Sequence, residues 1–321
     1  MMDSSLVAAT HRQAEMLANK VTKRFKHLHK RFAKQDIEAF RLYDWDIPEI
    51  RAAVDWYAGH LVMAEYVRRQ STPEWLPMMG AAVAEALSVP PEKLHLKERR
   101  VGKPDSSRYE RLDYTDRKII VSERDLKFYV NLNDFVDTGL FSDHRNTRQM
   151  VKELAYGKDF LNLYCYTGSF SCYAAKGGAT SSVSVDRSES AITWAKENMA
   201  LNGISGESHR FVQSPAFAYL ELAKRNNRVF DLAVVDPPSF STTKNGRNDF
   251  DVSRDHPILL RAVMAVMKKG GTIFFSTNHQ NFEPLMAGLE LSHLTEITKQ
   301  TIPEDYITKK RTIHRCWKIR V

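Results

Sequence analysis

The stretch Phe160–Ser169, FLNLYCYTGS, joins a short apolar run to a polar turn. Its first half has the apolar side chains of a buried strand, and Thr167-Gly168 marks a turn that leads into a helix. A glycine lets the backbone approach a ligand closely where a helix begins. This order of strand, glycine turn and helix predicts an open α/β sheet with a ligand beyond the carboxyl end of the strand.

The same alternation of strand and helix continues toward the carboxyl terminus. We expect strands at Ser182–Asp186, Phe211–Gln213, Phe230–Val235 and Thr272–Ser276, and helices at Ser188–Leu201, Ala216–Arg225 and His256–Met267. Further strands are expected after Leu291. The alternation predicts a mostly parallel sheet with helices on both faces, in a Rossmann-like α/β domain that occupies residues 135–321.

Residues 1–134 show a different pattern of predicted strands and helices. Strand-like runs at Ala52–Tyr57 and Leu61–Val67 precede the helix-like Pro73–Leu87, and the cationic segment Lys97–Asp105 is predicted as a loop. Strands mixed with helices and turns indicate a smaller N-terminal α+β domain. We expect this domain to serve RNA binding or another accessory role.

The first helix of this domain combines an apolar stripe with many cations. Apolar residues recur every three or four positions from Ala14 to Phe32, as they do on one face of a helix. The cations along it have no acidic residue among them; they are Lys20, Lys23, Arg24, Lys26, Lys30, Arg31 and Lys34. The pattern fits either an ordinary solvated helix face or a helix that follows RNA phosphates.

The whole chain carries a basic excess. Its 321 residues include 47 lysines and arginines against 39 aspartates and glutamates, a formal net charge of +8. An excess of this size favours a polyanionic partner, most simply nucleic acid. A second basic cluster near the end of the chain, Lys309, Lys310 and Arg311, is either a further RNA contact or a solvated edge.

Several classes of protein are excluded. No apolar run approaches the roughly 18 residues of a membrane span, and Met1–Ser5 lacks the start of a secretory signal. The three cysteines, Cys165, Cys172 and Cys316, are odd in number and lack zinc-site spacing. We therefore expect reduced thiols, no metal site, no membrane contact and a cytoplasmic location.

An acidic residue ends the second strand of the predicted sheet. Asp186 stands where a carboxylate can accept hydrogen bonds from both hydroxyls of a ribose. The alternative is an acid that complements the dipole of the following helix. The three-glycine fingerprint G-x-G-x-x-G is missing around Gly168, which favours a ligand without a pyrophosphate.

The fourth strand ends in the most specific motif of the chain, Val235-Asp236-Pro237-Pro238-Ser239-Phe240. Two prolines directly after an apolar strand fix the backbone where it leaves the sheet. They would hold Asp236 rigidly over the pocket, and Phe240 could offer a flat surface to a base. A turn that merely stops a strand is the alternative.

These motifs together resemble the class I S-adenosylmethionine-dependent methyltransferases, in which the Asp-Pro-Pro form serves the methylation of nucleic-acid bases. Further segments match one group of this family: Arg41–Glu49, Asp137–Arg145, Phe160–Ser169, Val235–Ser241, Asp249–His256 and Ile313–Trp317. The group resembles the K half of the fused bacterial K/L 23S ribosomal RNA methyltransferases, which methylates a guanine at N7. The resemblance implies a seven-stranded, mostly parallel class I methyltransferase sheet.

The resemblance also implies S-adenosylmethionine as cofactor and 23S ribosomal RNA as partner, with a guanine-N2 methyltransferase that is fused or separate. The implied cofactor-binding residues are Asn162, Tyr166, Thr167, Gly168, Asp186, Arg187, Gln213, Ser214 and Asp236, with Asp143 and Arg145 in a stretch that closes over the cofactor and places Arg145 near its carboxylate. The implied catalytic residues, which would face the reacting base, are Asp236, Pro237, Pro238 and Phe240.

One position departs from the family pattern. Pro215 stands after the third strand, where the family often has an acid for the adenine amine, so Ser214 or a backbone carbonyl must recognise adenine. This departure leaves open a ribosome-biogenesis RNA-binding protein that has lost catalysis. Guanine N2 also stays open as a target. Cytosine C5 is disfavoured because Ser239 follows the prolines and no cysteine stands there to attack the ring.

Overall fold

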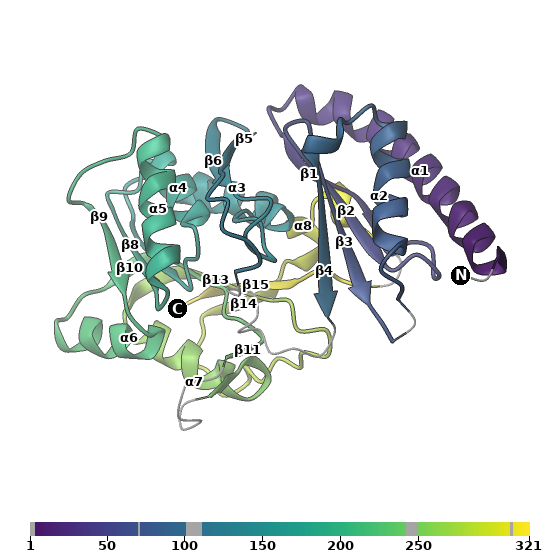
Figure 1. Ribbon diagram of the computed structural model, residues 1–321. Helices are drawn as coiled ribbons and strands as arrows, with labels where there is room; N and C mark the ends of the chain where they lie inside the picture. Colours follow the sequence, from purple (N-terminus) through teal and green to yellow (C-terminus); the bar gives the residue numbers. More distant parts are fainter. Residues whose placement is uncertain (1–3, 70, 101–110, 242–248, 309–310) are drawn as a thin grey trace. The chain divides into compact units, whose positions relative to one another are not determined.

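The computed structural model describes residues 4–69, 71–100, 111–241, 249–308 and 311–321 (Figure 1). These residues form two compact units, each with its own main sheet. The first unit takes in the described parts of Met1–Lys103, Ser107–Thr138 and Glu304–Lys310. The second is built chiefly from Gly139–Pro303 and Arg311–Val321. A short segment near the end of the chain thus belongs with the N-terminal residues.

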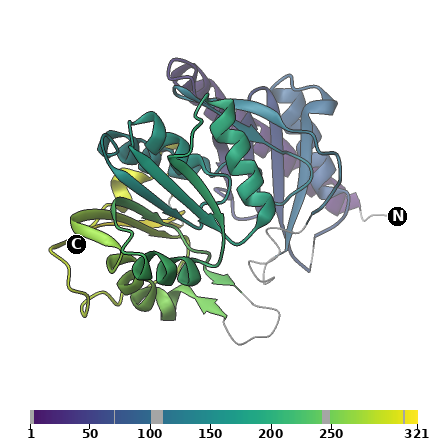
Figure 2. The ribbon, with the colours of Figure 1, turned by 90° about the vertical axis from the view of Figure 1, so that its left-hand side faces the viewer.

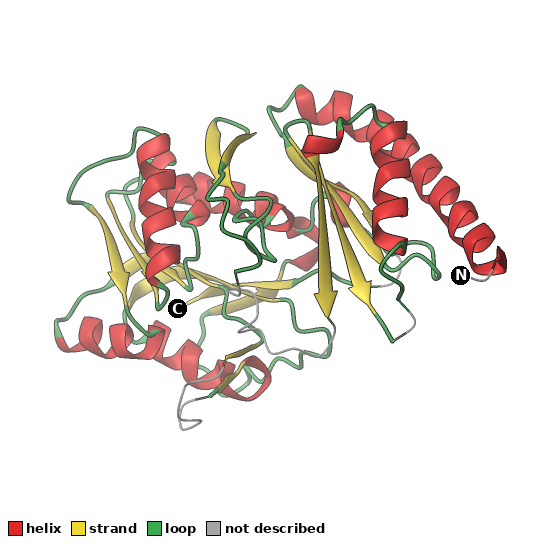
Figure 3. Ribbon diagram, in the orientation of Figure 1, coloured by secondary structure: helices red, strands yellow, loops and turns green. Residues whose placement is uncertain are grey.

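The second unit is built around a seven-stranded sheet (Figure 3). Its five parallel strands are β7 (Asp159–Leu163), β8 (Ser181–Asp186), β9 (His209–Gln213), β10 (Phe230–Val235) and β13 (Met267–Thr277). At one edge β15 (Arg315–Arg320) runs antiparallel to both β13 and β14 (His293–Glu296). The order β14-β15-β13-β10-β7-β8-β9 confirms the predicted seven-stranded, mostly parallel sheet.

Helices cover both faces of this sheet (Figures 1 and 2). One face carries α3 (Arg145–Leu154), α4 (Ser169–Lys176) and α5 (Glu189–Leu201), and the other carries α6 (Ala216–Arg225) and α7 (Val252–Met264). In β7, Phe160 packs in the α3–α4 core, whereas Leu161 and Leu163 pack in the α6–α7 core. Burial on both faces explains why these strands are continuous apolar runs in the sequence.

The first unit has a four-stranded sheet in the order β1 (Ala39–Asp44), β2 (Ala52–Tyr57), β3 (His60–Val67) and β4 (Leu94–Arg100), with only β4 parallel to its neighbour. The helices α1 (Ser4–Ala33) and α2 (Trp75–Ala86) share its core, and β5 (Ile119–Glu123) pairs with β6 (Leu126–Val130). The predicted stripe of α1 is buried from Ala14 to Phe32, except that Phe25 is half-buried. No helix of the described residues is long and apolar enough to cross a membrane.

The expected helix His256–Met267 is wrong at both ends. α7 already begins at Val252, because the Asp251 carboxylate caps it by accepting a hydrogen bond from the Ser253 N–H at 2.8 Å. It ends at Met264, and Met267 opens strand β13. The glycine pair at 270–271 therefore lies inside a strand, where the register with β10 shifts, and does not close a helix.

The expected loop Lys97–Asp105 is wrong in its first part, because residues 97–100 pair with β3 as part of β4. Residues 101–105 lie outside the described residues. Lys97 is only 4% exposed, and its ammonium donates to the Phe135 carbonyl at 2.6 Å. Burial lowers the pKa of Lys97 to about 8. The density of charged residues led us to expect a solvent-exposed loop, but the Lys97 ammonium is buried and bonds a carbonyl inside the unit.

Candidate functional site

The carboxyl ends of three neighbouring strands bring the predicted motifs together. Leu163, the last residue of β7, pairs with Val185 of β8 on one side and with Val235 of β10 on the other. The Thr167-Gly168 turn, Asp186 and Asp236 follow within a few residues of these positions. All three segments thus leave the sheet at one edge, between β8 and β10, where open α/β sheets bind their ligands.

The loop after β7 is held in an unusual conformation. Tyr164 and Tyr166 have φ angles of 57° and 48°, and Gly168 has 73°. Such left-handed conformations cost a non-glycine residue about 1–3 kcal/mol and cluster at functional sites. A Cβ atom on Gly168 would lie 2.8 Å from the Cβ of Ala195, so α5 approaches the turn closely. The glycine is therefore required by both the backbone angle and the packing.

The Asp186 side chain stabilises this loop through hydrogen bonds. Its carboxylate accepts hydrogen bonds from the backbone N–H groups of Tyr166 at 3.0 Å and Ser188 at 2.9 Å. Burial raises the pKa of the Asp186 carboxyl, although these N–H donors act in the opposite direction. The sequence analysis did not predict these hydrogen bonds to the Asp186 side chain, although an aspartate two residues before a helix-capping serine is a known turn signal.

Gln213, Ser214 and Arg187 lie beside Asp186. The Ser214 N–H donates to the Asp186 carbonyl at 2.9 Å, and the Gln213 amide donates to the Arg187 carbonyl at 3.5 Å. The Gln213 and Arg187 side chains are exposed, and Ser214 is partly exposed. Pro215 caps the start of α6 with an extended backbone. The structure thus brings three predicted cofactor residues to the same edge as Asp186.

Two other predicted cofactor residues bond inside the unit. The Asn162 side chain is 1% exposed and donates to Ser171 Oγ at 2.9 Å, which joins β7 to α4. The Thr167 hydroxyl, equally buried, donates to the Gly139 carbonyl at 2.6 Å. Asn198 of α5 donates to the Thr167 carbonyl at 2.8 Å. These buried side chains therefore support the loop after β7 through bonds within the unit.

Asp236 follows β10 and is 27% exposed at its side chain. Its Oδ1 atom accepts a hydrogen bond from the Ser276 hydroxyl at 2.6 Å, and its Oδ2 atom lies 3.6 Å from His144 Nε2. Pro237 is buried and Pro238 partly buried, and both carry the chain toward Phe240. Phe240 is 37% exposed and begins the short strand β11 (Phe240–Ser241), which pairs with β12 (Phe250–Asp251).

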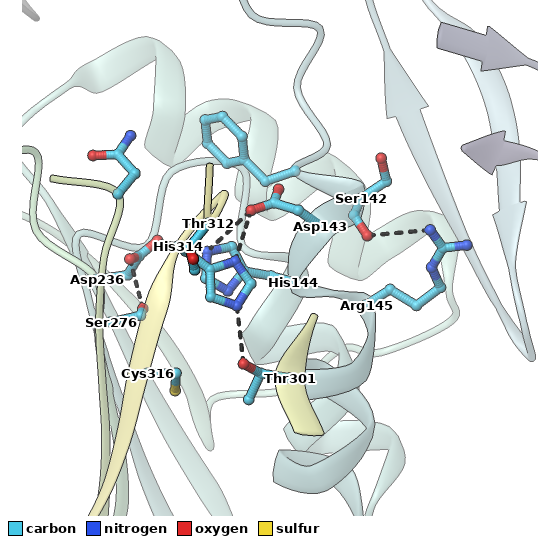
Figure 4. Close-up of polar contacts among 12 residues, drawn as sticks. Ser142, Asp143, His144, Arg145, Asp236, Ser276, Thr301, Thr312, His314 and Cys316 are labelled. Carbon is cyan, nitrogen blue, oxygen red and sulfur yellow. Dashed lines mark hydrogen bonds and ion pairs between the residues drawn. The ribbon is translucent and has the colours of Figure 1, made fainter. Parts of the chain in front are cut away.

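The segment ahead of α3 places a histidine beside Asp236 (Figure 4). This segment is the short helix η3 (Ser142–His144). His144 stacks on His314, and Asp143 contacts both rings. Arg145 is only 1% exposed; its guanidinium donates to the Ser142 carbonyl at 3.4 Å and points away from Asp236. The structure thus brings Asp143, but not Arg145, to Asp236.

Residues 45–296 match the family of S-adenosylmethionine-dependent methyltransferases. The chain belongs to this family. Ribosomal RNA large subunit methyltransferase K of Neisseria meningitidis serogroup B is 42% identical over 308 residues, which are 94% of this chain and 86% of that relative. Similar folds include a methyltransferase solved with S-adenosylhomocysteine (24% identity, TM-score 0.77, 96% of this chain and 82% of that one) and one from Streptococcus mutans (23%, 0.76, 96% and 81%).

Family membership confirms the class I fold and S-adenosylmethionine as the cofactor of this methyltransferase. The residues at the sheet edge fit that ligand. A carboxylate offers about four acceptor positions, and the backbone N–H groups of Tyr166, Ser188 and Arg187 do not use all of them at Asp186, so acceptor capacity remains for a ribose hydroxyl. The tight turn at Gly168 keeps side chains away from the place where the helix α4 begins.

The seven N-terminal cations predicted to bind RNA, six in α1 and Lys34 just after it, fall into two groups. Three bond within the first unit: Lys20 lies 3.3 Å from Asp46, Arg24 donates to the carbonyls of Glu304 and Asp305, and Arg31 lies 2.8 Å from Glu304. The other four are exposed, with no hydrogen bond or ion pair to any described residue; they are Lys23, Lys26, Lys30 and Lys34. We call these four the lysine row.

The predicted second RNA cluster is described only at Arg311. Lys309 and Lys310 lie outside the described residues. Arg311 is partly exposed and belongs to the second unit of the methyltransferase, whereas α1 belongs to the first.

Proposed function

We propose that this methyltransferase transfers the methyl group of S-adenosylmethionine to N7 of a guanine in 23S ribosomal RNA. The observation that carries the proposal is the 42% identity, over 94% of the chain, with a relative named ribosomal RNA large subunit methyltransferase K. The matched region includes the Asp-Pro-Pro turn and the glycine loop of the site. A ribosomal RNA substrate also favours action in the cytoplasm, alongside a fused or separate guanine-N2 methyltransferase.

The cysteines support a ring nitrogen over cytosine C5 as the target. Methylation at C5 requires a thiolate that attacks the ring. Cys165, Cys172 and Cys316, which are all the cysteines of the chain, are at most 5% exposed. Burial raises the pKa of each thiol, and that of Cys172 reaches about 12. None is therefore available as a nucleophile at neutral pH.

Guanine N7 suits this site because it carries a lone pair and no proton. The protein then needs only to exclude water, orient the base and hold N7 about 3–3.5 Å from the methyl carbon. The base gains positive charge as the sulfonium loses it. The Asp236 carboxylate, fixed by the Ser276 hydroxyl at 2.6 Å, would stabilise that charge. Pro237 and Pro238 keep its backbone rigid, and the exposed ring of Phe240 would stack on a base extruded from the RNA.

The cofactor would lie along the edge formed by the glycine loop, Asp186 and Asp236. Asp186 would accept bonds from the ribose hydroxyls, and Ser214 with Gln213 would face adenine in place of the acid that Pro215 displaces. Tyr166, Gly168 and Asp143 would line the methionine part. The lysine row would bind RNA phosphates, because exposed amines that bond no described residue are free to displace counterions.

The direct test is to incubate the protein with tritiated S-adenosylmethionine and unmodified 23S ribosomal RNA, then to map the product by mass spectrometry. A single 7-methylguanine is the expected result. Another methylated base, such as N2-methylguanine, would support the methyltransferase activity but overturn N7 as the target atom. RNA binding without transfer would overturn the enzymatic proposal and favour a binding protein, with Pro215 as the first residue to replace by aspartate.

A further inference from the structure

A chain of polar contacts leads from Asp236 into the interior of the second unit (Figure 4). The Ser276 hydroxyl donates to Asp236 Oδ1 at 2.6 Å, and His144 Nε2 lies 3.6 Å from Asp236 Oδ2. The same His144 nitrogen lies 3.7 Å from Asp143 Oδ2. One oxygen of Asp236 is thus held by a hydroxyl, and the other faces an imidazole.

His314 fixes the ring of His144. The two imidazoles stack with 4.2 Å between their centroids and 10° between their planes. His314 Nδ1 donates to Asp143 Oδ2 at 2.9 Å, and its Nε2 lies 3.0 Å from the Thr301 hydroxyl. His144 and His314 are 5% and 1% exposed. Burial and the stack on the hydrogen-bonded His314 ring therefore hold the His144 ring in one orientation.

The same side chains place three metal-ligating atoms, from Asp143, His144 and His314, within 4.8 Å of one another. An imidazole binds a metal ion in the plane of its ring, along the lone pair of a nitrogen. Two stacked rings in nearly parallel planes do not direct their lone pairs to one ion. His314 Nδ1 must also carry a proton, because the carboxylate 2.9 Å away can only accept. The geometry therefore favours hydrogen bonding over a metal site.

The titratable and charged groups that act on His144 are Asp143, Asp236, His314 and Arg148. Burial lowers the pKa of His144, and His314 lowers it further, which outweighs the two carboxylates. The ring is therefore neutral at neutral pH. Its proton belongs on Nε2, which faces two carboxylates, since Nδ1 is buried without a hydrogen-bond partner among the described residues. A neutral N–H can orient Asp236 without cancelling its charge.

We propose that His144, stacked on His314 and braced by Asp143, is a positioning residue that orients the Asp236 carboxylate for methyl transfer. The inference rests on the proposed function, because it assigns Asp236 the role of stabilising the charged base. The Ser276 hydroxyl holds Oδ1 of Asp236 at 2.6 Å, and the His144 N–H faces Oδ2 from 3.6 Å, an electrostatic contact longer than a hydrogen bond, so the two groups act on different oxygens and restrict the rotation of the carboxylate. Orientation of this kind serves the transition state and leaves the binding of cofactor and RNA unchanged.

The test compares two substitutions of His144 in the full chain. His144→Phe keeps the stack on His314 but removes the N–H, whereas His144→Gln offers an amide N–H near the position of Nε2. We expect His144→Phe to lower kcat by about 10- to 100-fold, since a misplacement of about 1 Å can cost about 100-fold. His144→Gln should recover most of that loss. The KM values for S-adenosylmethionine and RNA should stay within about two-fold for both.

His209→Phe is the matched control. His209 is a partly buried histidine that bonds a serine, Ser182, but it opens β9 at the opposite edge of the sheet from Asp236. It should keep the wild-type kcat, and thermal unfolding should report any loss of fold in each variant. Cofactor affinity, measured by calorimetry without RNA, gives a readout independent of turnover.

Each outcome separates the two proposals. Failure of the wild-type protein to methylate ribosomal RNA would overturn the proposed function before any variant is compared. A wild-type kcat in His144→Phe would overturn the positioning role alone. Equal losses in the Phe and Gln variants, or a loss of cofactor affinity that parallels kcat, would also overturn it, because a fold or cofactor role would then explain the data.

Discussion

The lysine row, in and just after α1, and the carboxyl edge of the seven-stranded sheet are both polar, but they are built in opposite ways. Lys23, Lys26, Lys30 and Lys34 are exposed and bond no described residue. At the sheet edge, in contrast, Asp186, Asp236 and His144 each contact defined partners at defined distances. Free surface charges supply affinity that is additive and salt-sensitive. Fixed, partly buried groups supply geometry, so the cost of losing one is large and specific.

The largest effect should come from Asp236. Asp236→Asn keeps the size of the side chain and can still accept from Ser276, but it removes the negative charge. We expect methyl transfer to fall by about 100- to 1000-fold, with RNA affinity nearly intact. Transfer is measured with tritiated cofactor, and RNA affinity by filter binding. Full activity in this variant would show that the Asp236 charge does not assist methyl transfer. Weaker RNA binding would show that Asp236 also contributes to RNA affinity, which we assign to the lysine row.

Gly168 should give the next largest effect, on cofactor binding. In Gly168→Ala the new Cβ meets the Cβ of Ala195 at 2.8 Å while φ stays at 73°, so the loop must move. Gly203→Ala is the matched control, because Gly203 has a φ of 67° but nothing lies within 4 Å of its added Cβ. Both variants should lose about 1 kcal/mol of stability from the backbone angle.

Only Gly168→Ala should also weaken S-adenosylmethionine binding, by about ten-fold or more, as measured by calorimetry. Equal cofactor affinity in the two variants would show that the close approach of α5 to this turn does not shape the cofactor site.

Local patterns were enough to place the sheet edge. The predicted ends of β2, α6 and β10 coincide with the observed ones, and Ser188 caps α5 as expected. Gly168 and Asp236 follow strands that the apolar pattern reveals, Asp186 ends another, and parallel strands bring their ends to one edge. These features depend on residues close together in the chain, which is why the sequence alone could predict them.

Contacts between distant residues were not predictable in this way. His314 and Asp143 are hydrogen-bonded although they lie 171 positions apart in the sequence. No local pattern near either residue therefore predicts the stacked histidines beside Asp236. Arg24 was predicted to bind RNA, yet it donates to carbonyls 280 and 281 positions away, and this bonding has no signal in the helix itself. A helical stripe shows which face is polar, but only the folded chain shows which cations are already bonded.

The lysine row should give a smaller, graded effect. Replacing Lys23, Lys26 and Lys30 together by alanine should weaken RNA binding and lower the salt dependence of log K by about 2, since each lost phosphate contact removes about 0.7–0.9 from the slope. The control replaces Lys176, Lys224 and Lys269, which are exposed and lie toward the opposite edge of the sheet from Asp236. Its net charge changes equally, so an equal loss of slope would show that overall charge, and not this row, binds RNA.

The smallest effect separates two neighbours on one helix. Lys30 is free of described partners, whereas Arg31 lies 2.8 Å from Glu304 and bonds His27 at 3.1 Å. Lys30→Ala should lower RNA affinity on the order of three-fold, and Arg31→Ala by less than about two-fold, because the arginine's charge is already matched by a carboxylate. Their stabilities should differ in the other direction, with only Arg31→Ala losing up to about 1 kcal/mol, since its ion pair is half-exposed. Filter binding and chemical denaturation measure the two quantities. If Arg31→Ala weakened RNA binding more than Lys30→Ala, bonding within the unit would not withdraw a cation from the RNA face, and the division of the α1 cations into two groups would have to be abandoned.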